Sequence, residues 1–104
     1  MFKDRLIVIT GGSSGLGEAL AKRFITKGSD LALIARDRNK LLRVREMLRS
    51  MAAPGQRIGI FTCDVADEAA TVQTFNAITG DMGVPDMLIN SAGILKEGYF
   101  EKLP

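Results

Sequence analysis

Short apolar runs alternate along the chain with longer segments in which apolar residues recur every three or four positions. Four runs are mostly apolar and of strand length: residues 6–10, 31–35, 58–62 and 87–90. The first is apolar almost throughout, which is typical of a strand covered on both faces of a sheet. Between these runs, three segments have the helical repeat: residues 15–27, 40–51 and 68–82. The pattern therefore predicts seven elements in strict strand–helix alternation.

Strands that are joined by crossover helices must be parallel, and such crossovers are right-handed. The chain is therefore predicted to be an α/β protein with a doubly wound parallel sheet in the strand order 3-2-1-4. Each helix should bury one apolar stripe: Leu16, Leu20 and Phe24, then Leu41, Val44, Leu48 and Met51, then Val72, Phe75, Ile78 and Met82. Gly28 is placed to end the first helix.

Composition narrows the classes of function. The 104 residues are 46% hydrophobic and 25% charged, with a net charge of +2 and basic residues scattered along the chain, which argues against a nucleic-acid partner. The chain has no histidine, which excludes Ser-His-Asp chemistry and the commonest metal ligand, and its single cysteine fits a reducing compartment. No signal peptide or membrane-spanning stretch is recognisable, so we expect a cytoplasmic protein.

Residues 10–17 read TGGSSGLG and place four glycines between the first strand and the first helix. Glycines at a helix N-terminus let a phosphate approach the backbone N–H groups. The spacing is neither G-x-G-x-x-G nor a P-loop, since Glu18 stands where a P-loop needs lysine. The run is either a tight turn with no ligand or a phosphate site, to which the hydroxyls of Ser13 and Ser14 would contribute.

Three motifs together resemble the short-chain dehydrogenase/reductase family: T-G-x-x-x-G-x-G after the first strand, Asp64-Val65 after the third, and Asn90-Ser91-Ala92-Gly93 after the fourth. The resemblance implies a Rossmann-type sheet and an oxidoreductase. It also implies that the cofactor is held by Gly11, Ser13, Ser14, Gly15, Leu16 and Gly17. Asp64 and Val65 would contact the adenine, and Ala92 and Gly93 would lie close to a ribose. Asn90 is also assigned to the cofactor site, although in the family it mostly ties neighbouring strands together.

The end of the second strand bears on which dinucleotide binds. An acidic residue about 20 positions past the glycines hydrogen-bonds the 2′-OH of NAD. Here that place looks like Ala35, and Arg36 follows it, so that a guanidinium is available for a 2′-phosphate, with Lys40 adding a second positive charge. The sequence therefore favours NADP(H). Asp37 keeps NAD(H) open, because a shift of two positions would let it reach the ribose.

The family's proton-donating tyrosine has a lysine four residues later. The only tyrosine here is Tyr99, which is followed by Leu103 at that spacing, with Lys102 one position short. We therefore assign no catalytic residue and expect the chain alone to be inactive. On this interpretation the 104 residues are one NADP(H)-binding half of a longer domain. Its fourth strand would then be an exposed edge, which favours homo-oligomers or self-association through that edge.

The segments ARDRNKL, PDMLINSAG and GYFEKLP resemble reductases of long-chain or sphingoid ketones, in particular 3-ketodihydrosphingosine reductases. The leading hypothesis is therefore hydride transfer between NADP(H) and a small-molecule ketone or secondary alcohol. Two alternatives stay open: a non-catalytic NADP(H)-binding or regulatory module that is complete at this length, and an interaction domain whose glycines are only structural.

Overall fold

The computed structural model describes residues 2–91, and in them four strands alternate with three helices. The elements are β1 (Leu6–Thr10), α1 (Gly15–Thr26), β2 (Asp30–Ala35), α2 (Arg38–Arg49), β3 (Ile58–Thr62), α3 (Glu68–Met82) and β4 (Met87–Asn90). Within residues 2–91, no helix combines the length and the apolar composition that a bilayer crossing requires.

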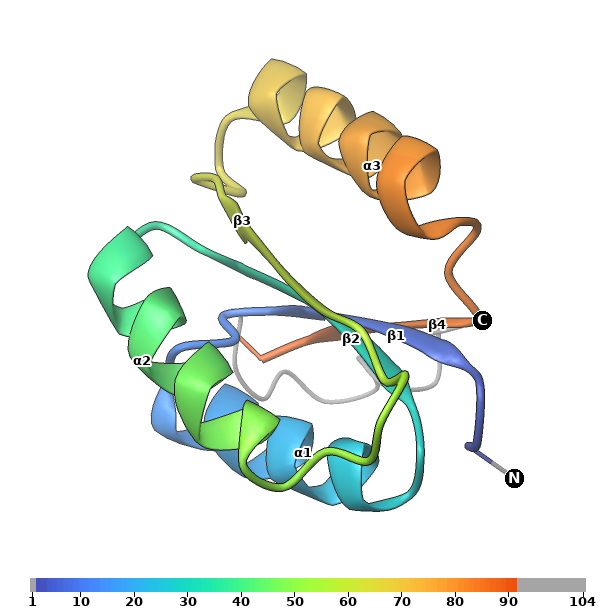
Figure 1. The fold of residues 1–104 in the computed structure, drawn as a ribbon. Coiled ribbons are helices and arrows are strands. Elements are labelled where there is room, and N and C mark those ends of the chain that lie inside the picture. Colours follow the sequence, from blue (N-terminus) through green and yellow to red (C-terminus); the bar gives the residue numbers. More distant parts are fainter. Residues whose placement is uncertain (1, 92–104) are drawn as a thin grey trace, which may run out of the picture.

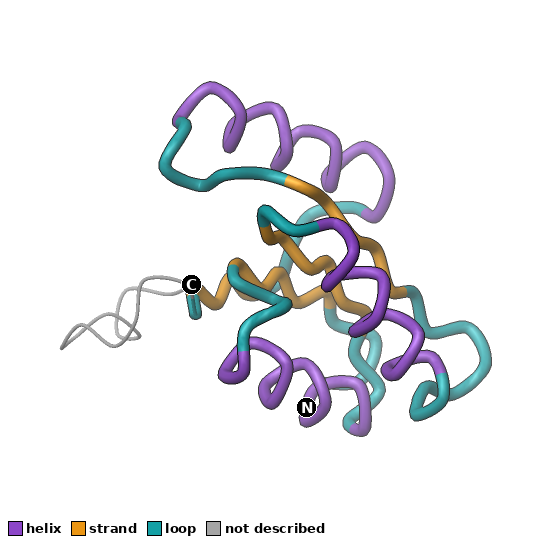
Figure 2. The backbone as a smooth tube through the Cα atoms, turned by 90° about the vertical axis from the view of Figure 1, so that its left-hand side faces the viewer, coloured by secondary structure: helices purple, strands orange, loops and turns teal. Residues whose placement is uncertain are grey.

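The four strands form one parallel sheet in the order β3-β2-β1-β4, which confirms the predicted topology. Helices α1 and α2 lie together on one side of this sheet and α3 covers the other side (Figure 1). After β3 the chain crosses to the far side of β1, so the winding direction changes between β1 and β4. Figure 2 shows the same three layers from the side. In such sheets a ligand binds outside the carboxyl ends of the strands, at this change of direction.

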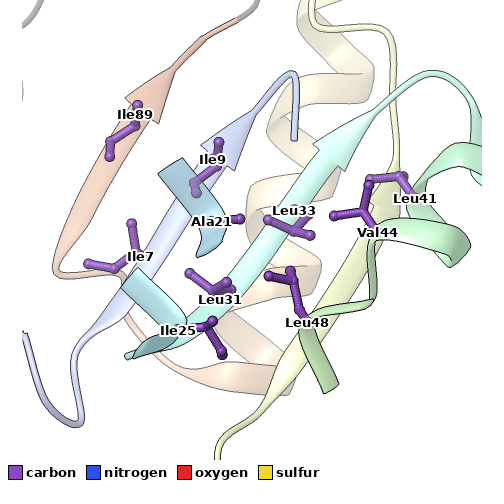
Figure 3. Close-up of a cluster of buried hydrophobic side chains, with 10 residues drawn as sticks. All are labelled: Ile7, Ile9, Ala21, Ile25, Leu31, Leu33, Leu41, Val44, Leu48 and Ile89. Carbon is purple, nitrogen blue, oxygen red and sulfur yellow. The ribbon is translucent and has the colours of Figure 1, made fainter. Parts of the chain in front are cut away.

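The two central strands, β1 and β2, are buried on both faces, which is why they are almost entirely apolar. On the side of α1 and α2, the core contains side chains from both of these helices and from β1, β2 and β4: Ile7, Ile9, Ala21, Ile25, Leu31, Leu33, Leu41, Val44, Leu48 and Ile89 (Figure 3). On the side of α3 it contains Leu6, Val8, Ala32, Ile34, Cys63 and Ile78. Successive residues of β1 and β2 thus point to opposite faces, as the strand repeat requires.

Each helix begins at a polar side chain that accepts a backbone N–H group. The side chains of Ser14, Asp37 and Asp67 cap α1, α2 and α3 by accepting from the third residue that follows each of them. This satisfies one of the N–H groups that a helix start leaves without an intrahelical partner. At the other end of α1, Gly28 has a φ of 89°, and it ends the helix as expected.

The predicted helix faces and bounds need correction, beginning with α1, which ends at Thr26 rather than at residue 27. Helix α2 starts two residues earlier than expected, because Asp37 caps it, and it ends at Arg49. Met51 therefore lies outside the helix, and 38% of it is exposed. Leu16 and Val72 are exposed as well, because α1 turns Ala21 and Ile25 to the sheet instead and α3 buries Ile78. Apolar spacing located the helices but did not fix their rotation.

Replacing Leu33 by alanine tests the central packing. Leu33 is fully buried between β2 and the α1–α2 layer, so we expect Leu33→Ala to lower the free energy of unfolding by about 2–5 kcal/mol. Urea denaturation followed by circular dichroism measures this. Val84→Ala is the control, because 78% of Val84 is exposed and its loss should change stability by less than about 0.5 kcal/mol. Equal effects of the two substitutions would contradict the described core.

Candidate functional site

A pocket of about 910 Å³ opens at the carboxyl ends of β1, β2 and β3. Its walls come from the turns that follow these three strands, from the end of β2 and from the start of α2: Gly11, Ser13, Ser14, Ile34, Ala35, Arg36, Asp37, Arg38, Asn39, Lys40, Cys63, Asp64, Val65 and Ala66. The turn after β1 leads into α1, and the turn after β2 leads into α2, so two helix N-termini border the pocket. Parallel strands bring these turns together because all of their carboxyl ends lie at one edge of the sheet.

The turn after β1 is hydrogen-bonded to the end of β2. The N–H groups of Gly11 and Gly12 both donate to the carbonyl oxygen of Ile34, at 2.7 and 3.1 Å. The carbonyl oxygen of Gly11 accepts from the N–H and the hydroxyl of Ser14, at 3.0 and 2.7 Å. Gly11 has a φ of 71°, in the left-handed region that favours glycine. The turn is therefore fixed by bonds that use the inward-facing groups of its backbone.

The outward-facing N–H groups of the same turn remain available. Within residues 2–91, those of Ser13, Gly15 and Leu16 have no hydrogen-bond acceptor. A side-chain carbon added to Gly15 would meet no atom within 4 Å, so the space in front of this helix start is open. The N-terminal turn of a helix also carries a partial positive charge. This end of α1 can accept an anion.

The other glycines of the run serve packing rather than ligand access. A side-chain carbon on Gly12 would lie 2.9 Å from Cβ of Leu33, in the core. One on Gly17 would collide with the carbonyl oxygen of Gly11 and would lie 2.9 Å from Oγ of Ser91. Gly17, which we predicted to bind the cofactor, is buried in α1 and does not line the pocket.

Three cationic side chains surround the start of α2. Arg36, Arg38 and Lys40 are all exposed and line the pocket, and within the described residues none of them forms an ion pair. Asp37, between them, accepts the N–H of Lys40 at 3.1 Å through its Oδ1. The carboxylate is therefore engaged as a helix cap, while the three cations are available to an anion.

Positive charge is concentrated in one part of the described chain, although it looks scattered in the sequence. Residues 2–57 contain twelve lysines and arginines and five acidic residues, whereas residues 58–91 contain five acidic residues and no lysine or arginine. The first group includes α1 and α2, and the second includes α3 on the opposite side of the sheet (Figure 1). The pocket opens between these two regions.

The third wall of the pocket follows β3. Oδ1 of Asp64 accepts the N–H of Ala66 at 3.0 Å, and this closes a tight turn around Val65. Val65 is 38% exposed and lines the pocket beside Asp64. Asp67, not Asp64, caps α3. An apolar side chain next to a carboxylate offers one surface for a flat ring and one acceptor for an amino group.

A hydrogen-bonded link joins the ends of β1 and β4. The hydroxyl of Thr10 donates to Oδ1 of Asn90 at 2.8 Å, and the hydroxyl of Ser91 donates to the carbonyl oxygen of Thr10 at 2.6 Å. Asn90 thus connects two strands and does not line the pocket. Ala92, Gly93 and Tyr99 lie outside the described residues.

The structure brings seven of the predicted site residues together around the pocket: Gly11, Ser13, Ser14, Arg36, Lys40, Asp64 and Val65. Gly15 and Leu16 border its helix end without lining it. That these residues bind a cofactor stays a prediction. Sequence reasoning missed Ser91, whose position beside the turn after β1 depends on the register of β4, and Cys63, a buried pocket wall that gives no signal in the sequence.

Comparison with known proteins identifies the family. The model for the short chain dehydrogenase family matches residues 5–104, and the chain therefore belongs to this family. A 3-ketodihydrosphingosine reductase of Cryptococcus neoformans is 46% identical over 70 residues, which is 67% of this chain and 20% of that protein. A 2,3-dihydro-2,3-dihydroxybenzoate dehydrogenase of Bacillus subtilis is 33% identical over 97% of this chain and 38% of its own length. The chain thus spans well under half the length of these curated relatives.

Solved structures agree with this assignment. The L-sorbose reductase of Gluconobacter frateurii, in complex with NADPH and L-sorbose, superposes with a TM-score of 0.81 at 30% identity. That match covers 88% of this chain and 34% of the reductase. A xylitol dehydrogenase with bound NAD⁺ superposes with a TM-score of 0.78 at 28% identity, over 84% of this chain and 32% of that one. Both nicotinamide dinucleotides thus occur among proteins of this fold.

Two glycines of the turn should respond differently to alanine. Gly17→Ala places a methyl group against the backbone of Gly11, so we expect the free energy of unfolding to fall by about 1–3 kcal/mol. Gly15→Ala meets open space and should stay within about 1 kcal/mol of the wild type. Urea denaturation without ligand measures both. A larger loss for Gly15→Ala than for Gly17→Ala would refute the division of the glycines into packing and ligand-facing positions.

Proposed function

We propose that this chain is the dinucleotide-binding part of an oxidoreductase that transfers hydride between NADP(H) and a ketone or secondary alcohol. The observation that carries the proposal is the arrangement at the end of β2. Arg36 is exposed at the pocket with no ion-pair partner in the described residues, and the neighbouring carboxylate of Asp37 is engaged as a helix cap. The family is that of oxidoreductases, and its members with known structures include NADPH-bound and NAD⁺-bound enzymes.

The charge at this position supports NADP(H) over NAD(H). NAD-binding sites of this kind place a carboxylate on the ribose 2′-OH, and that carboxylate would repel a 2′-phosphate. Here the strand ends at Ala35, and Asp37 already accepts a backbone N–H. A guanidinium gives a phosphate two parallel charge-assisted hydrogen bonds. Arg36 is thus the expected partner of the 2′-phosphate, with Lys40 contributing a second positive charge.

The remaining groups of the pocket fit the rest of a dinucleotide. The available N–H groups of Gly15 and Leu16, at the open N-terminus of α1, suit a diphosphate. Asp64 and Val65 suit the exocyclic amine and the ring of an adenine. When bound, NADP(H) supplies or accepts the hydride. The residues of this chain bind and orient the dinucleotide.

The resemblance and the relatives support a proposal for the substrate class. A 3-ketodihydrosphingosine reductase and a 3-dehydrosphinganine reductase are 46% and 31% identical to this chain over the matched regions. We therefore propose a long-chain or sphingoid ketone as the substrate of the enzyme. The sequence contains no Tyr-x-x-x-Lys pattern, so we expect these 104 residues to bind NADPH without reducing a ketone. Fluorescence titration with NADPH, followed by an assay of NADPH oxidation in the presence of the ketone, tests both expectations.

Arg36→Ala separates the two cofactors. Loss of the guanidinium should raise the Kd for NADPH by about 10- to 100-fold, because each charge-assisted hydrogen bond contributes roughly 1.5–3 kcal/mol. The Kd for NADH should change by less than about twofold, since NADH carries no 2′-phosphate. Titration of nicotinamide fluorescence with each cofactor measures the two constants.

Arg49→Ala is the matched control for this substitution. Arg49 is an exposed arginine at the far end of α2, where it pairs with Glu46, so its removal should leave both constants unchanged. Equal losses of NADPH and NADH affinity in Arg36→Ala would refute the assignment of Arg36 to the 2′-phosphate.

Asp37→Ala tests the alternative in which Asp37 serves the ribose of NAD. We expect the free energy of unfolding to fall by about 1 kcal/mol, because the cap of α2 is lost. The ratio of the NADPH and NADH constants should not shift toward NADPH. A selective loss of NADH affinity would instead support the NAD assignment. Denaturation and the same titrations give both results.

A further inference from the structure

We propose that Ser91 is a positioning residue for the diphosphate of the bound dinucleotide. This inference rests on the proposed NADP(H) function and deepens it. Ser91 directly follows β4, far from the TGGSSGLG turn in the sequence. It does not line the pocket. It would act through the turn, by holding the backbone that presents the N–H groups of Gly15 and Leu16.

The hydroxyl of Ser91 is buried against the turn. Ser91 is 6% exposed, and its Oγ lies 2.6 Å from the carbonyl oxygen of Thr10 and 3.2 Å from that of Gly11. Its backbone N–H also donates to the carbonyl oxygen of Thr10, at 3.0 Å. One hydroxyl proton is shared between two carbonyls, with the shorter bond to Thr10. The end of β4 therefore fixes two successive peptide groups at the start of the turn.

These peptide groups set the position of α1. The carbonyl oxygen of Gly11 also accepts both donors of Ser14, the residue that caps α1. Gly17, one helical turn further, approaches both that carbonyl and Oγ of Ser91 so closely that a side-chain carbon would not fit. The helix start is thus located by a three-way contact between the turn, α1 and the end of β4. Without the hydroxyl, two carbonyls lose a donor and a gap opens beside Gly17, which allows the helix start to shift.

The other end of the pocket is held by different bonds. At the ends of β2 and β3, the N–H of Lys40 donates to Oδ1 of Asp37 at 3.1 Å, and the N–H of Cys63 donates to the carbonyl oxygen of Ala35 at 2.9 Å. Neither set involves Ser91. Removal of the hydroxyl should consequently weaken contacts to the diphosphate and leave those to the adenosine 2′-phosphate portion intact.

Ser91→Ala in the full 104-residue chain tests this selectivity with two ligands. NADPH carries the diphosphate, whereas adenosine 2′-monophosphate carries only the adenosine and the 2′-phosphate. We expect the Kd for NADPH, from fluorescence titration, to rise about 10-fold, the scale of one buried hydrogen bond. The Kd for adenosine 2′-monophosphate, from calorimetry, should stay within about twofold of the wild type.

Ser29→Ala is the matched control. Ser29 is fully buried, and its hydroxyl donates to the carbonyl oxygen of Phe2 at 2.7 Å, at the opposite end of the sheet from the pocket. This substitution removes a comparable bond and should lower the unfolding temperature without changing the ratio of the two dissociation constants. If Ser91→Ala does not fold, Ser91→Cys keeps the volume with a weaker donor and should show a smaller loss of the same selectivity.

Three results would overturn the inference. An unchanged Kd for NADPH in Ser91→Ala, or equal losses for both ligands, would show that Ser91 does not act on the diphosphate. A change of the ratio in Ser29→Ala as large as that in Ser91→Ala would make the effect one of general stability. In each of these cases the wild type still binds NADPH and the proposed function stands. A wild type that binds neither ligand would overturn both proposals.

Discussion

The inward-facing carbonyl group of Gly11 is the constraint on which the ligand-facing end of this structure depends. It accepts two hydrogen bonds from Ser14 and a longer one from Ser91, and it leaves no room for a side chain at Gly17. Because this carbonyl turns inward, the available N–H groups at Gly15 and Leu16 face the open space before α1. A glycine-rich turn is intrinsically costly in backbone entropy. Here the turn is held by hydrogen bonds to Ile34 at the end of β2 and to Ser91 after β4.

The fold could be predicted from the sequence because the apolar runs, the helical repeats and the glycines between them all indicated the same alternation of strands and helices. Continuous apolar runs located all four strands, and the parallel order followed from the intervening helices. The sequence did not determine the rotation of the helices about their axes or the register in which the strands pair. Leu16 and Val72 obey the helical spacing and are nevertheless exposed, since α1 packs Ala21 and Ile25 into the core and α3 packs Ile78. Ser91 meets the first turn only because β4 pairs with β1 in one particular register, which pairs Thr10 with Asn90.

The same division applies to the site. Motif spacing brought out the residues of three separate turns, and the parallel sheet does gather them around one pocket. The motif treated its glycines at 11, 15 and 17 alike, whereas the structure assigns Gly17 to packing and leaves Gly15 facing open space. The sequence left two roles open for Asp37, because a carboxylate that caps a helix and one that binds a ribose look identical in a sequence. In the structure its Oδ1 accepts the N–H of Lys40. Family membership adds the redox chemistry, which none of the described side chains reveals alone.

The separation of charge between the two sides of the sheet has a consequence for how a ligand arrives. The proposed NADP(H) ligand is a polyanion, so the positive region over α1 and α2 would attract it and the acidic region beside α3 would repel it. Together the two regions would orient the ligand so that its phosphates face the basic side chains at the start of α2 before contact. This effect is electrostatic steering. Because the screening length at physiological ionic strength is about 8 Å, this steering acts only when the ligand is within roughly that distance of the protein surface.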